Sequence, residues 1–441
     1  MAKLFGTDGV RGKANIYPMT PDFAVKLGQV AGLELATKYK RVAIGKDTRI
    51  SGDMLESALV SGFTSVGVDV VLLGVLPTPA VSYYAQSLDV DLAIIISASH
   101  NPYFDNGIKM KDGEGETLPK SVTNLLEQKI GQEIELNPER IGRVIYNHEV
   151  YSKYVKSFEK FASLKGLKVV IDSANGAFSS IASGVLKNLG AEVVAIGNEP
   201  NGININMGCG STKTDLMCQT VVETKANIGI ALDGDGDRIV VADEKGNRVN
   251  CDQLIAFLAT YFKEENKLSA PAVVTTELSN MGISKYAKSL GLTYYATGVG
   301  EQCVVEKLIE IGANVGGEES GHIVLRDYSK SGDGLVVGIS LCEALLKTKK
   351  KMNEVFPIFE MFPMTINNVR FETKEKASAA VDSSEAVKII EECKQKLGTT
   401  GSLIVRKSGT EPIIRLYIQG EDKKILDEVT QIMLNLVEKG K

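Results

Sequence analysis

The sequence has no long hydrophobic run and no excess of basic residues, and both absences narrow the possible functions. No segment has the ~18 uninterrupted apolar residues that a membrane span needs, and the first six residues lack the apolar core of a secretory signal. The 50 Lys and Arg residues stand against 55 Asp and Glu residues, a formal net charge of −5. Because general nucleic-acid binding needs a basic surface that releases counterions, we expect neither a membrane nor a nucleic acid as partner.

Cysteine and histidine are also scarce. The six cysteines of the 441-residue chain form no C-x-x-C pair. This is typical of reduced core residues, so the cytoplasm is the expected compartment. Of the three histidines, His100 and His322 lie inside motifs described below. No Walker A loop and no G-x-G-x-x-G occurs, so nucleotide dependence is not indicated.

The chain is too long for one hydrophobic core, since a single core rarely grows beyond about 250–300 residues. Short β-branched runs alternate with longer amphipathic stretches, which predicts α/β units. Three units repeat a similar order of strands, and their third strands, over 92–96, 228–232 and 313–315, each run into a polar loop. Ligands bind outside the carboxyl ends of strands in open α/β sheets, so these three loops are candidate binding loops.

The pattern changes after Pro363 and predicts a small α+β domain. Its predicted elements are a strand over 369–372, a helix over 384–396, a hairpin with strands over 403–405 and 413–418, and a closing helix over 425–438. We therefore expect four domains, covering 1–151, 152–250, 251–365 and 366–441.

The first motif is S-A-S-H-N-P at 97–102. A serine hydroxyl at the end of a buried strand, such as that of Ser99, can carry a phosphoryl group if a base and an electrostatic clamp lie near it. Lys109 follows ten residues later, close enough in the chain to turn back to the site. The alternative is an ordinary Ser/Asn turn. No G-x-S-x-G is present, which disfavours an α/β-hydrolase.

The second motif is D-G-D-G-D-R, whose carboxylates belong to Asp233, Asp235 and Asp237. The intervening glycines let the backbone fold tightly, so that the oxygens converge on one hard cation. An EF-hand begins similarly, but its sixth position needs Gly and here has Arg238. An aspartyl-nucleophile phosphotransferase also places D-x-D after a strand, and from this motif alone it remains an alternative.

The third motif is G-E-E-S-G-H at 317–322. In an extended loop, Glu318, Ser320 and His322 would point the same way. A carboxylate, a hydroxyl and an imidazole suit sugar hydroxyls, which both donate and accept hydrogen bonds. A solvated acidic loop is an equally good interpretation of this motif by itself.

Cations and hydroxyls gather in a fourth motif, R-K-S-G-T-E-P, between two predicted strands. Arginine forks match phosphate geometry, and hydroxyls with a Gly N–H complete an anion nest. The alternative is a polar hairpin turn. The candidate phosphate-binding residues are Arg406, Ser408, Gly409, Thr410 and Arg415.

Two basic loops, G-T-D-G-V-R-G at 6–12 and G-K-D-T-R at 45–49, belong to the first unit. Their arginines, Arg11 and Arg49, are candidates for placing positive charge against a phosphorylated Ser99.

With the four motifs in this order, the sequence resembles the α-D-phosphohexomutase superfamily over nearly its whole length. Several stretches are typical of the branch that acts on glucosamine phosphates: F-G-T-D-G-V-R-G at 5–12, D-T-R-I-S-G at 47–52, P-N-G-I-N at 200–204 and S-N-M-G at 279–282. The resemblance implies an α/β fold with three related α/β/α domains, mixed sheets and a smaller C-terminal α+β domain around a central cleft.

The resemblance also implies an isomerase that interconverts glucosamine 6-phosphate and glucosamine 1-phosphate through a bisphosphorylated sugar, and so supplies UDP-N-acetylglucosamine synthesis. Ser99 would be phosphorylated, and its phosphate would join Asp233, Asp235 and Asp237 in binding one Mg²⁺. Lys109 matches a general acid/base. The further implied residues are His100, Arg11 and Arg49 for catalysis, Arg238, Glu318, Ser320 and His322 for the substrate, and the fourth motif for its phosphate.

Two departures accompany the resemblance. Relatives commonly read V-G-D-R where this chain has V-G-E-Q at 299–302, so a substrate or structural contact of that Arg is expected to be missing. Gly401-Ser402 stands where many relatives have Gly-Arg. The alternatives are a phosphomannomutase or phosphoglucomutase of the same superfamily, or a phosphosugar-binding protein without turnover. The oligomeric state stays open, with a homodimer as one arrangement.

Overall fold

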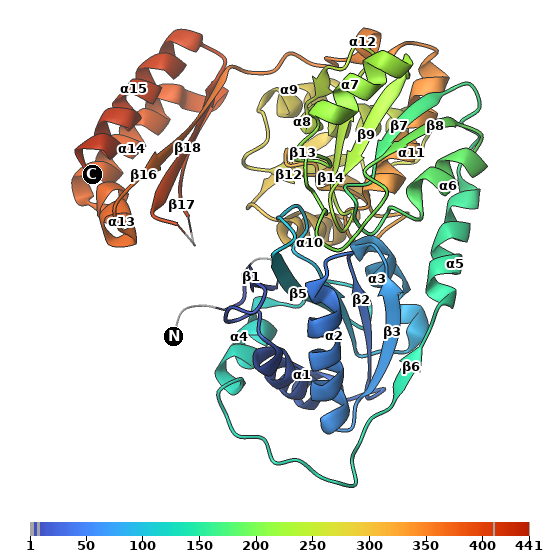
Figure 1. Cartoon of the computed structure of the whole chain (residues 1–441). Coiled ribbons are helices and arrows are strands. Elements are labelled where there is room, and N and C mark those ends of the chain that lie inside the picture. Colours follow the sequence, from blue (N-terminus) through green and yellow to red (C-terminus); the bar gives the residue numbers. More distant parts are fainter. Residues whose placement is uncertain (1–3, 7–8, 409–410, 441) are drawn as a thin grey trace.

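Four sheets, each with its own helices, organise the chain (Figure 1). The computed structural model describes residues 4–6, 9–408 and 411–440. We call the four parts the first unit (residues 10–146), the second unit (149–249), the third unit (251–355) and the fourth unit (364–439). The predicted fold class, three related α/β units and a smaller α+β unit, is confirmed.

The first unit has a six-stranded sheet in the order β1-β5-β4-β2-β3-β6. The strands β2, β3, β4 and β6 run parallel, and β5 pairs antiparallel with β4 and β1. All five residues of β4 are buried, which is what an apolar β-branched run predicts for a central parallel strand. The elements of the first unit are β1 (Val10–Lys13), α1 (Pro21–Leu35), β2 (Arg41–Lys46), α2 (Ser51–Ser65), β3 (Asp69–Val75), α3 (Thr78–Tyr84), β4 (Leu92–Ile96), β5 (Asp105–Asp112), α4 (Lys120–Lys129) and β6 (Val144–Tyr146).

The second unit has a five-stranded sheet in the order β11-β10-β9-β7-β8. The strands β7, β8 and β9 are parallel, and β10 returns antiparallel to β9. Its elements are α5 (Glu149–Ser157), β7 (Lys168–Asp172), α6 (Ala182–Asn188), β8 (Glu192–Ile196), α7 (Asp215–Thr224), β9 (Ile228–Leu232), β10 (Ile239–Ala242) and β11 (Arg248–Val249). The aspartate motif therefore forms the connection between β9 and β10.

The third unit has a four-stranded sheet in the order β13-β12-β14-β15. Its elements are α8 (Cys251–Glu264), β12 (Ala272–Thr276), α9 (Gly282–Ser289), β13 (Thr293–Thr297), α10 (Glu301–Ile311), β14 (Val315–Gly317), β15 (Ile323–Leu325), α11 (Gly334–Thr348) and α12 (Met352–Val355). The strand predicted over 313–315 lies two residues later, because α10 ends at Ile311 and Gly312 caps it in a left-handed conformation. The β14–β15 connection holds the third motif.

The three units thus share one device: a central parallel strand, a polar loop and an antiparallel return strand. The pairs are β4–β5, β9–β10 and β14–β15. This explains the repeat seen in the sequence.

The fourth unit has an antiparallel sheet in the order β16-β18-β17, with helices on one face only (Figure 1). Its elements are β16 (Met364–Arg370), α13 (Lys374–Asp382), α14 (Ser384–Leu397), β17 (Gly401–Lys407), β18 (Ile413–Gly420) and α15 (Lys423–Lys439). The prediction missed α13 and placed β16 too late. β16 is an edge strand with mostly exposed residues, so its first part carries little apolar signal.

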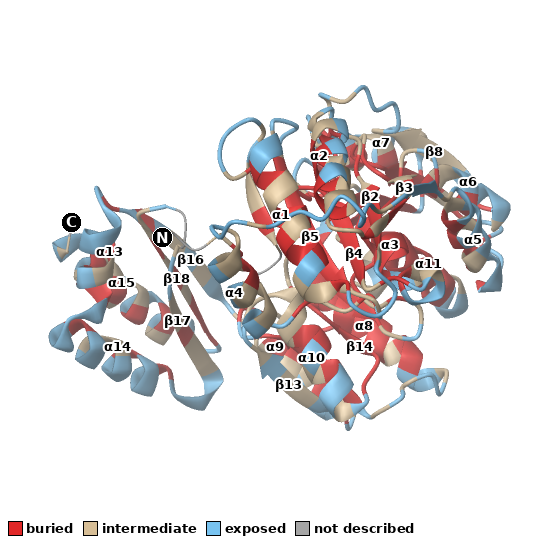
Figure 2. Ribbon diagram, turned by 90° about the horizontal axis from the view of Figure 1, so that it is seen from below, coloured by how far each residue is buried: buried red, intermediate tan, exposed pale blue. Residues whose placement is uncertain are grey.

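The largest hydrophobic cluster runs through the first three units, each of which also has a separate smaller cluster, and the fourth unit has its own core (Figure 2). The fourth unit joins the third through Gln419, whose side chain accepts a hydrogen bond from Met281 N at 2.8 Å and donates to Ser279 O at 3.0 Å. Among the described residues, no helix has the length and apolar character that a membrane crossing requires.

Candidate active site

The first two motifs meet at Ser99. This residue follows β4, is buried, and has a φ of +54°, a left-handed conformation that is unusual for a residue with a side chain. Its Oγ donates a hydrogen bond to Asp233 Oδ2 at 2.6 Å and lies 3.3 Å from His100 Nδ1. A backbone outlier whose hydroxyl is aimed at a carboxylate is the arrangement expected of a functional residue.

The Arg49 guanidinium holds the loop that carries Ser99, residues 97–102, in place. Its Nε donates to Asp47 Oδ2 at 2.9 Å. Its other four N–H groups donate to backbone carbonyls of the loop and of β5, those of Ser99, Asn101, Pro102 and Asp105. Because a guanidinium has five N–H donors and all five are engaged, Arg49 fixes the loop rather than facing a phosphoryl group. The prediction that it would place its charge against the phosphoserine is therefore replaced by a positioning role.

The second unit also holds this loop. Asn206 Nδ2 donates to Ser99 O at 2.9 Å and to Asn101 O at 3.0 Å. Ile50 N donates to Gly202 O at 2.9 Å. The stretches 47–52 and 200–204, noted in the sequence for their resemblance, thus form the junction between the first two units.

The three aspartates form a buried cluster. Asp233, Asp235 and Asp237 each offer an oxygen within 4.8 Å of the others. The two glycines between them allow this: a Cβ on Gly234 would lie 2.7 Å from Ser99 O, and Gly236 has a φ of +75°.

Two further side chains hold Asp235. Its Oδ2 accepts hydrogen bonds from Thr78 Oγ1 at 2.6 Å and from Lys109 Nζ at 2.8 Å. Lys109 Nζ also lies 3.0 Å from Asp237 Oδ2. β5, which carries Lys109, therefore brings a cation from the first unit to the carboxylates of the second.

The cluster fits a divalent metal ion. Burial, together with the neighbouring Asp237 and Asp235, raises the pKa of Asp233 well above its usual range. Asp235 Oδ1 is buried and has no hydrogen-bond partner within the described part of the chain. Crowded hard oxygens, one of them without a partner, are the ligands that Mg²⁺ prefers. These residues can bind a metal ion.

Three basic residues, His100, Arg238 and Arg11, belong to the neighbourhood of Ser99 and Asp233. Burial, with Arg238 and Arg11 nearby, lowers the pKa of His100 to about 4. His100 is therefore neutral at physiological pH, so one of its ring nitrogens can donate and the other can accept a hydrogen bond. Arg238 N donates to Asp233 Oδ1 at 3.1 Å, and its side chain stays partly exposed. Arg11, on β1, pairs in register with Gly107 of β5.

The third motif forms a tight turn and not the extended loop that we predicted. Glu318 N donates to His322 O at 2.9 Å, so these two residues face each other across the β14–β15 hairpin. Glu318 Oε1 accepts a hydrogen bond from Gly300 N at 2.9 Å. His322 is buried, with Nδ1 at 3.8 Å from Asp237 Oδ1. Ser320 Oγ lies 3.5 Å from Glu318 Oε2 and is only partly buried.

The fourth motif lies at the tip of the β17–β18 hairpin, in the unit that stands to one side of the other three (Figure 1). Arg406 and Arg415 are directly opposite each other in the antiparallel register, so their side chains share a face. Like charges in such a pair are destabilising unless an anion lies between them. Arg415 Nε is buried and has no hydrogen-bond partner among the described residues. Ser408 Oγ accepts from Glu411 N at 3.2 Å. The predicted Gly409 and Thr410 lie outside the described residues.

Sequence reasoning missed three residues of this site: Asp47, Thr78 and Asn206. Thr78 follows the parallel strand β3, so the strand-end rule that selected Ser99 and Asp233 would also have found it. Asp47 and Asn206 stand inside noted stretches or next to them, but their partners became visible only with the fold.

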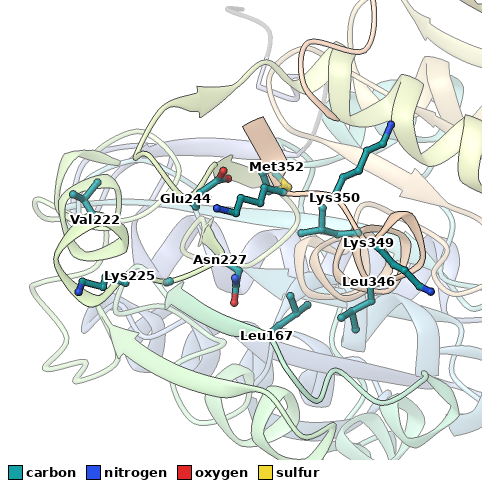
Figure 3. A pocket seen from close by; sticks show the side chains of 12 residues that line it. Leu167, Val222, Lys225, Asn227, Glu244, Leu346, Lys349, Lys350 and Met352 are labelled. Atoms are coloured by element: carbon teal, nitrogen blue, oxygen red, sulfur yellow. The ribbon is translucent and has the colours of Figure 1, made fainter. Parts of the chain in front are cut away.

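A cavity of about 520 Å³ lies elsewhere, at the opposite end of β9 from Asp233 (Figure 3). Leu167, Leu346 and Met352 give it apolar walls, with Asn227 and Glu244 as polar groups. It adjoins the start of the strand, so it is not part of the site at the strand ends.

Comparison with known families agrees with the fold. Models of all four phosphoglucomutase/phosphomannomutase domains match in order: α/β/α domain I at residues 2–137, domain II at 146–246, domain III at 250–362 and the C-terminal domain at 367–436. The chain therefore belongs to the phosphoglucomutase/phosphomannomutase family, and the predicted family is confirmed.

Two relatives are similar in sequence over nearly the whole chain. Phosphoglucosamine mutase from Methylobacterium nodulans is 44% identical over 100% of both chains. Phosphoglucosamine mutase from Parvibaculum lavamentivorans is 44% identical over 99% of this chain and 98% of its own.

Solved structures share the fold. A phosphoglucomutase/phosphomannomutase family protein from Burkholderia thailandensis superposes with a TM-score of 0.81 at 23% identity, covering 100% of this chain and 98% of that one. N-acetylphosphoglucosamine mutase from Aspergillus fumigatus, in complex with GlcNAc-6P and magnesium, gives a TM-score of 0.67 at 15% identity, covering 100% and 96%.

Proposed function

We propose that the chain is a cytoplasmic phosphoglucosamine mutase that interconverts glucosamine 6-phosphate and glucosamine 1-phosphate. The observation that carries this proposal is the hydrogen bond from Ser99 Oγ to Asp233 inside the buried aspartate cluster. It joins the phosphoryl carrier and the cation ligands of the proposed reaction. The identity of 44% to phosphoglucosamine mutases over the whole chain favours the amino sugar as substrate.

In the proposed reaction, phosphorylated Ser99 gives its phosphoryl group to the free hydroxyl of the sugar phosphate. The bond from Ser99 Oγ to phosphorus breaks and a bond from the sugar oxygen to phosphorus forms. The proton of the sugar hydroxyl ends on Ser99 Oγ, so that the serine hydroxyl is restored. The bisphosphorylated sugar then turns over and returns its other phosphoryl group to Ser99. Mg²⁺ bound to the three aspartates would neutralise charge on the transferring group.

The described side chains support these steps. Neutral His100, with Nδ1 3.3 Å from Ser99 Oγ, can share a hydrogen bond with that oxygen. Lys109, fixed by Asp235 and Asp237, is the proposed general acid/base. Arg11 and Arg238 place positive charge beside His100 and Asp233. Arg49 keeps the loop in place.

The substrate would be held at two places. Glu318, Ser320 and His322 on the β14–β15 turn are proposed to bind the sugar hydroxyls. The fourth unit is proposed to bind the phosphate that is not being transferred, through Arg406, Ser408, Gly409, Thr410 and Arg415.

A parallel assay on glucosamine 6-phosphate, glucose 6-phosphate and mannose 6-phosphate tests the substrate. We expect the highest kcat/KM for glucosamine 6-phosphate. A clear preference for glucose or mannose would instead favour the phosphoglucomutase or phosphomannomutase alternative. No turnover of any of the three would favour a binding protein.

Replacing Arg415 tests the proposed phosphate clamp. A clamp on the non-reacting phosphate binds the ground state and the transition state alike, so Arg415→Ala should mainly raise KM. A lost charge-assisted bond is worth on the order of 1.5–3 kcal/mol, or roughly ten- to a hundredfold in kcat/KM. Lys388→Ala is the matched control, since it removes an exposed cation from helix α14 of the same unit. Unchanged KM and kcat in Arg415→Ala would exclude Arg415 from the site.

A further inference from the structure

Glu301 is a largely buried carboxylate with a set of partners that the proposed reaction leaves unexplained. It is the first residue of α10, and its side chain is 13% exposed. Glu301 Oε1 lies 2.9 Å from His322 Nε2 and accepts a hydrogen bond from Gly332 N at 3.1 Å. Glu301 Oε2 lies 3.9 Å from Lys111 Nζ. A carboxylate at a helix N-terminus is also favoured by the helix dipole.

These contacts continue into the aspartate cluster. His322 Nδ1 lies 3.8 Å from Asp237 Oδ1, and Lys109 Nζ lies 3.0 Å from Asp237 Oδ2. Lys109 and Lys111 are alternate residues of β5, so both side chains leave the same face of the strand. Lys109 reaches the aspartates, and Lys111 approaches Glu301. A continuous series of alternating charges therefore links the first unit, the third unit and the metal-binding loop of the second.

Neighbouring opposite charges in this series stabilise each other's ionised forms. His322 is buried between two carboxylates, with Nε2 2.9 Å from Glu301 Oε1 and Nδ1 3.8 Å from Asp237 Oδ1. Burial opposes ionisation of Glu301, yet His322 and Lys111 hold the pKa of Glu301 well below its usual range. Buried ions of this kind persist only when they are paired, and removing one partner is costly.

The positions of the two ring nitrogens of His322 indicate the role of Glu301. The bond made by one nitrogen of an imidazole ring fixes which atom the other nitrogen faces. With Nε2 of His322 held by Glu301, its Nδ1 is turned toward Asp237. We propose that Glu301 is a positioning residue of the mutase reaction, whose carboxylate orients the His322 ring toward the aspartate loop and the sugar bound beside it. This inference rests on the proposed place of His322 in the active site.

The proposal also bears on the V-G-E-Q sequence at 299–302, where the chain departs from its relatives. The sequence suggested only that a contact of an Arg at position 302 is missing. In the structure the preceding residue, Glu301, meets a cation from β5, Lys111, and pairs with His322. Glu301, the neighbour of the Gln that stands in place of the Arg, is therefore part of the ionic network of the site.

The first test replaces the carboxylate. Glu301→Gln keeps the size and the acceptor for Gly332 N but removes the charge. We expect kcat to fall about 10- to 100-fold, the usual cost of losing a partner that orients an active-site ligand, while KM changes little. Glu301→Asp keeps the charge on a shorter side chain and should recover a large part of the lost kcat. Glu310→Gln, which removes an exposed carboxylate from the same helix, should behave as the wild type.

A double-mutant cycle separates an effect through His322 from a general effect on stability. In a His322→Asn background, Glu301→Gln should cost no further kcat, because the ring that Glu301 orients is gone. Equal costs in both backgrounds, a wild-type kcat in Glu301→Gln, or an Asp variant as impaired as the Gln variant would each overturn the proposal. A wild-type kcat in His322→Asn would overturn it as well.

The substrate assignment is kept apart from this test. The cycle is run on whichever hexose 6-phosphate the wild-type enzyme converts fastest. A wrong substrate assignment would then appear in the wild-type assay, whereas a wrong role for Glu301 would appear only in the cycle.

Discussion

Ser99→Ala is expected to abolish mutase turnover and to leave the protein folded. The substitution removes the hydroxyl that donates to Asp233 from the loop after β4, and with it the proposed phosphoryl acceptor. Losing one buried hydrogen bond costs about 1–3 kcal/mol, which is less than the usual 5–15 kcal/mol of total stability. Steady-state assays with glucosamine 6-phosphate, together with circular dichroism of the purified variant, measure both parts of the expectation.

The matched control for this substitution lies in the same loop. Ser97 Oγ donates to Asp47 Oδ2 at 2.6 Å and accepts from Ser99 N at 2.9 Å, so it supports the loop without facing the aspartate cluster. Ser97→Ala should lower turnover and not abolish it. Wild-type turnover in Ser99→Ala, with contaminating mutase excluded, would show that the phosphoryl group is carried elsewhere.

Asp235→Asn should weaken Mg²⁺ binding and reduce kcat steeply. The side chain keeps its shape and an acceptor for Thr78 and Lys109, but one ligand charge is lost from a site built of three carboxylates. A metal ion is worth several kcal/mol of transition-state charge stabilisation, so we expect a loss of about 10²–10³ in kcat. Calorimetric titration with Mg²⁺ should show weaker binding without reference to activity.

The control for the metal site is Asp215→Asn, which neutralises an exposed aspartate in the first turn of α7 in the same unit. Its Mg²⁺ affinity and kcat should match those of the wild type. Chelation with EDTA should stop turnover by the wild-type enzyme. Full activity in EDTA, or unchanged Mg²⁺ binding by Asp235→Asn, would refute the assignment of the aspartates as metal ligands.

The central strands were the most predictable part of the fold. The run over 92–96 and the run over 228–232 are short, apolar and bounded by turn residues, and all residues of β4 and β9 are buried. The repeat of strand and polar loop also pointed to three related units, and in the structure each loop is followed by an antiparallel return strand. The α/β class follows from these features and the family from the four motifs in their order, and both are confirmed.

Weakly amphipathic surface elements could not be predicted in the same way. Helix α13 is short and is followed after one residue, Ser383, by α14, and the helix predicted over 384–396 covered α14 alone. Ser383 ends the first helix and caps the second by accepting a hydrogen bond from Ala386 N. This cap separates the two helices.

The partners of the charged side chains were the least predictable part of the site. The sequence identified Arg49 as a cation near Ser99, but a local motif does not reveal that five acceptors from three segments surround its guanidinium. Similarly, Glu301 and Lys111 are far apart in the chain, and only the packing of the first unit on the third brings them together. Residue types could be inferred from sequence, whereas these roles depend on the arrangement of the units.

The central claim, that Ser99 carries the phosphoryl group, can be tested in a single turnover. Purified enzyme is phosphorylated with a ³²P-labelled bisphosphorylated hexose, freed of small molecules, and mixed with unlabelled glucosamine 6-phosphate in the presence of Mg²⁺. We predict that peptide mass analysis finds the phosphate on Ser99 before mixing and that the label then appears in a sugar phosphate. Label that stays on the protein, or a phosphate at a residue other than Ser99, would contradict the proposed mechanism.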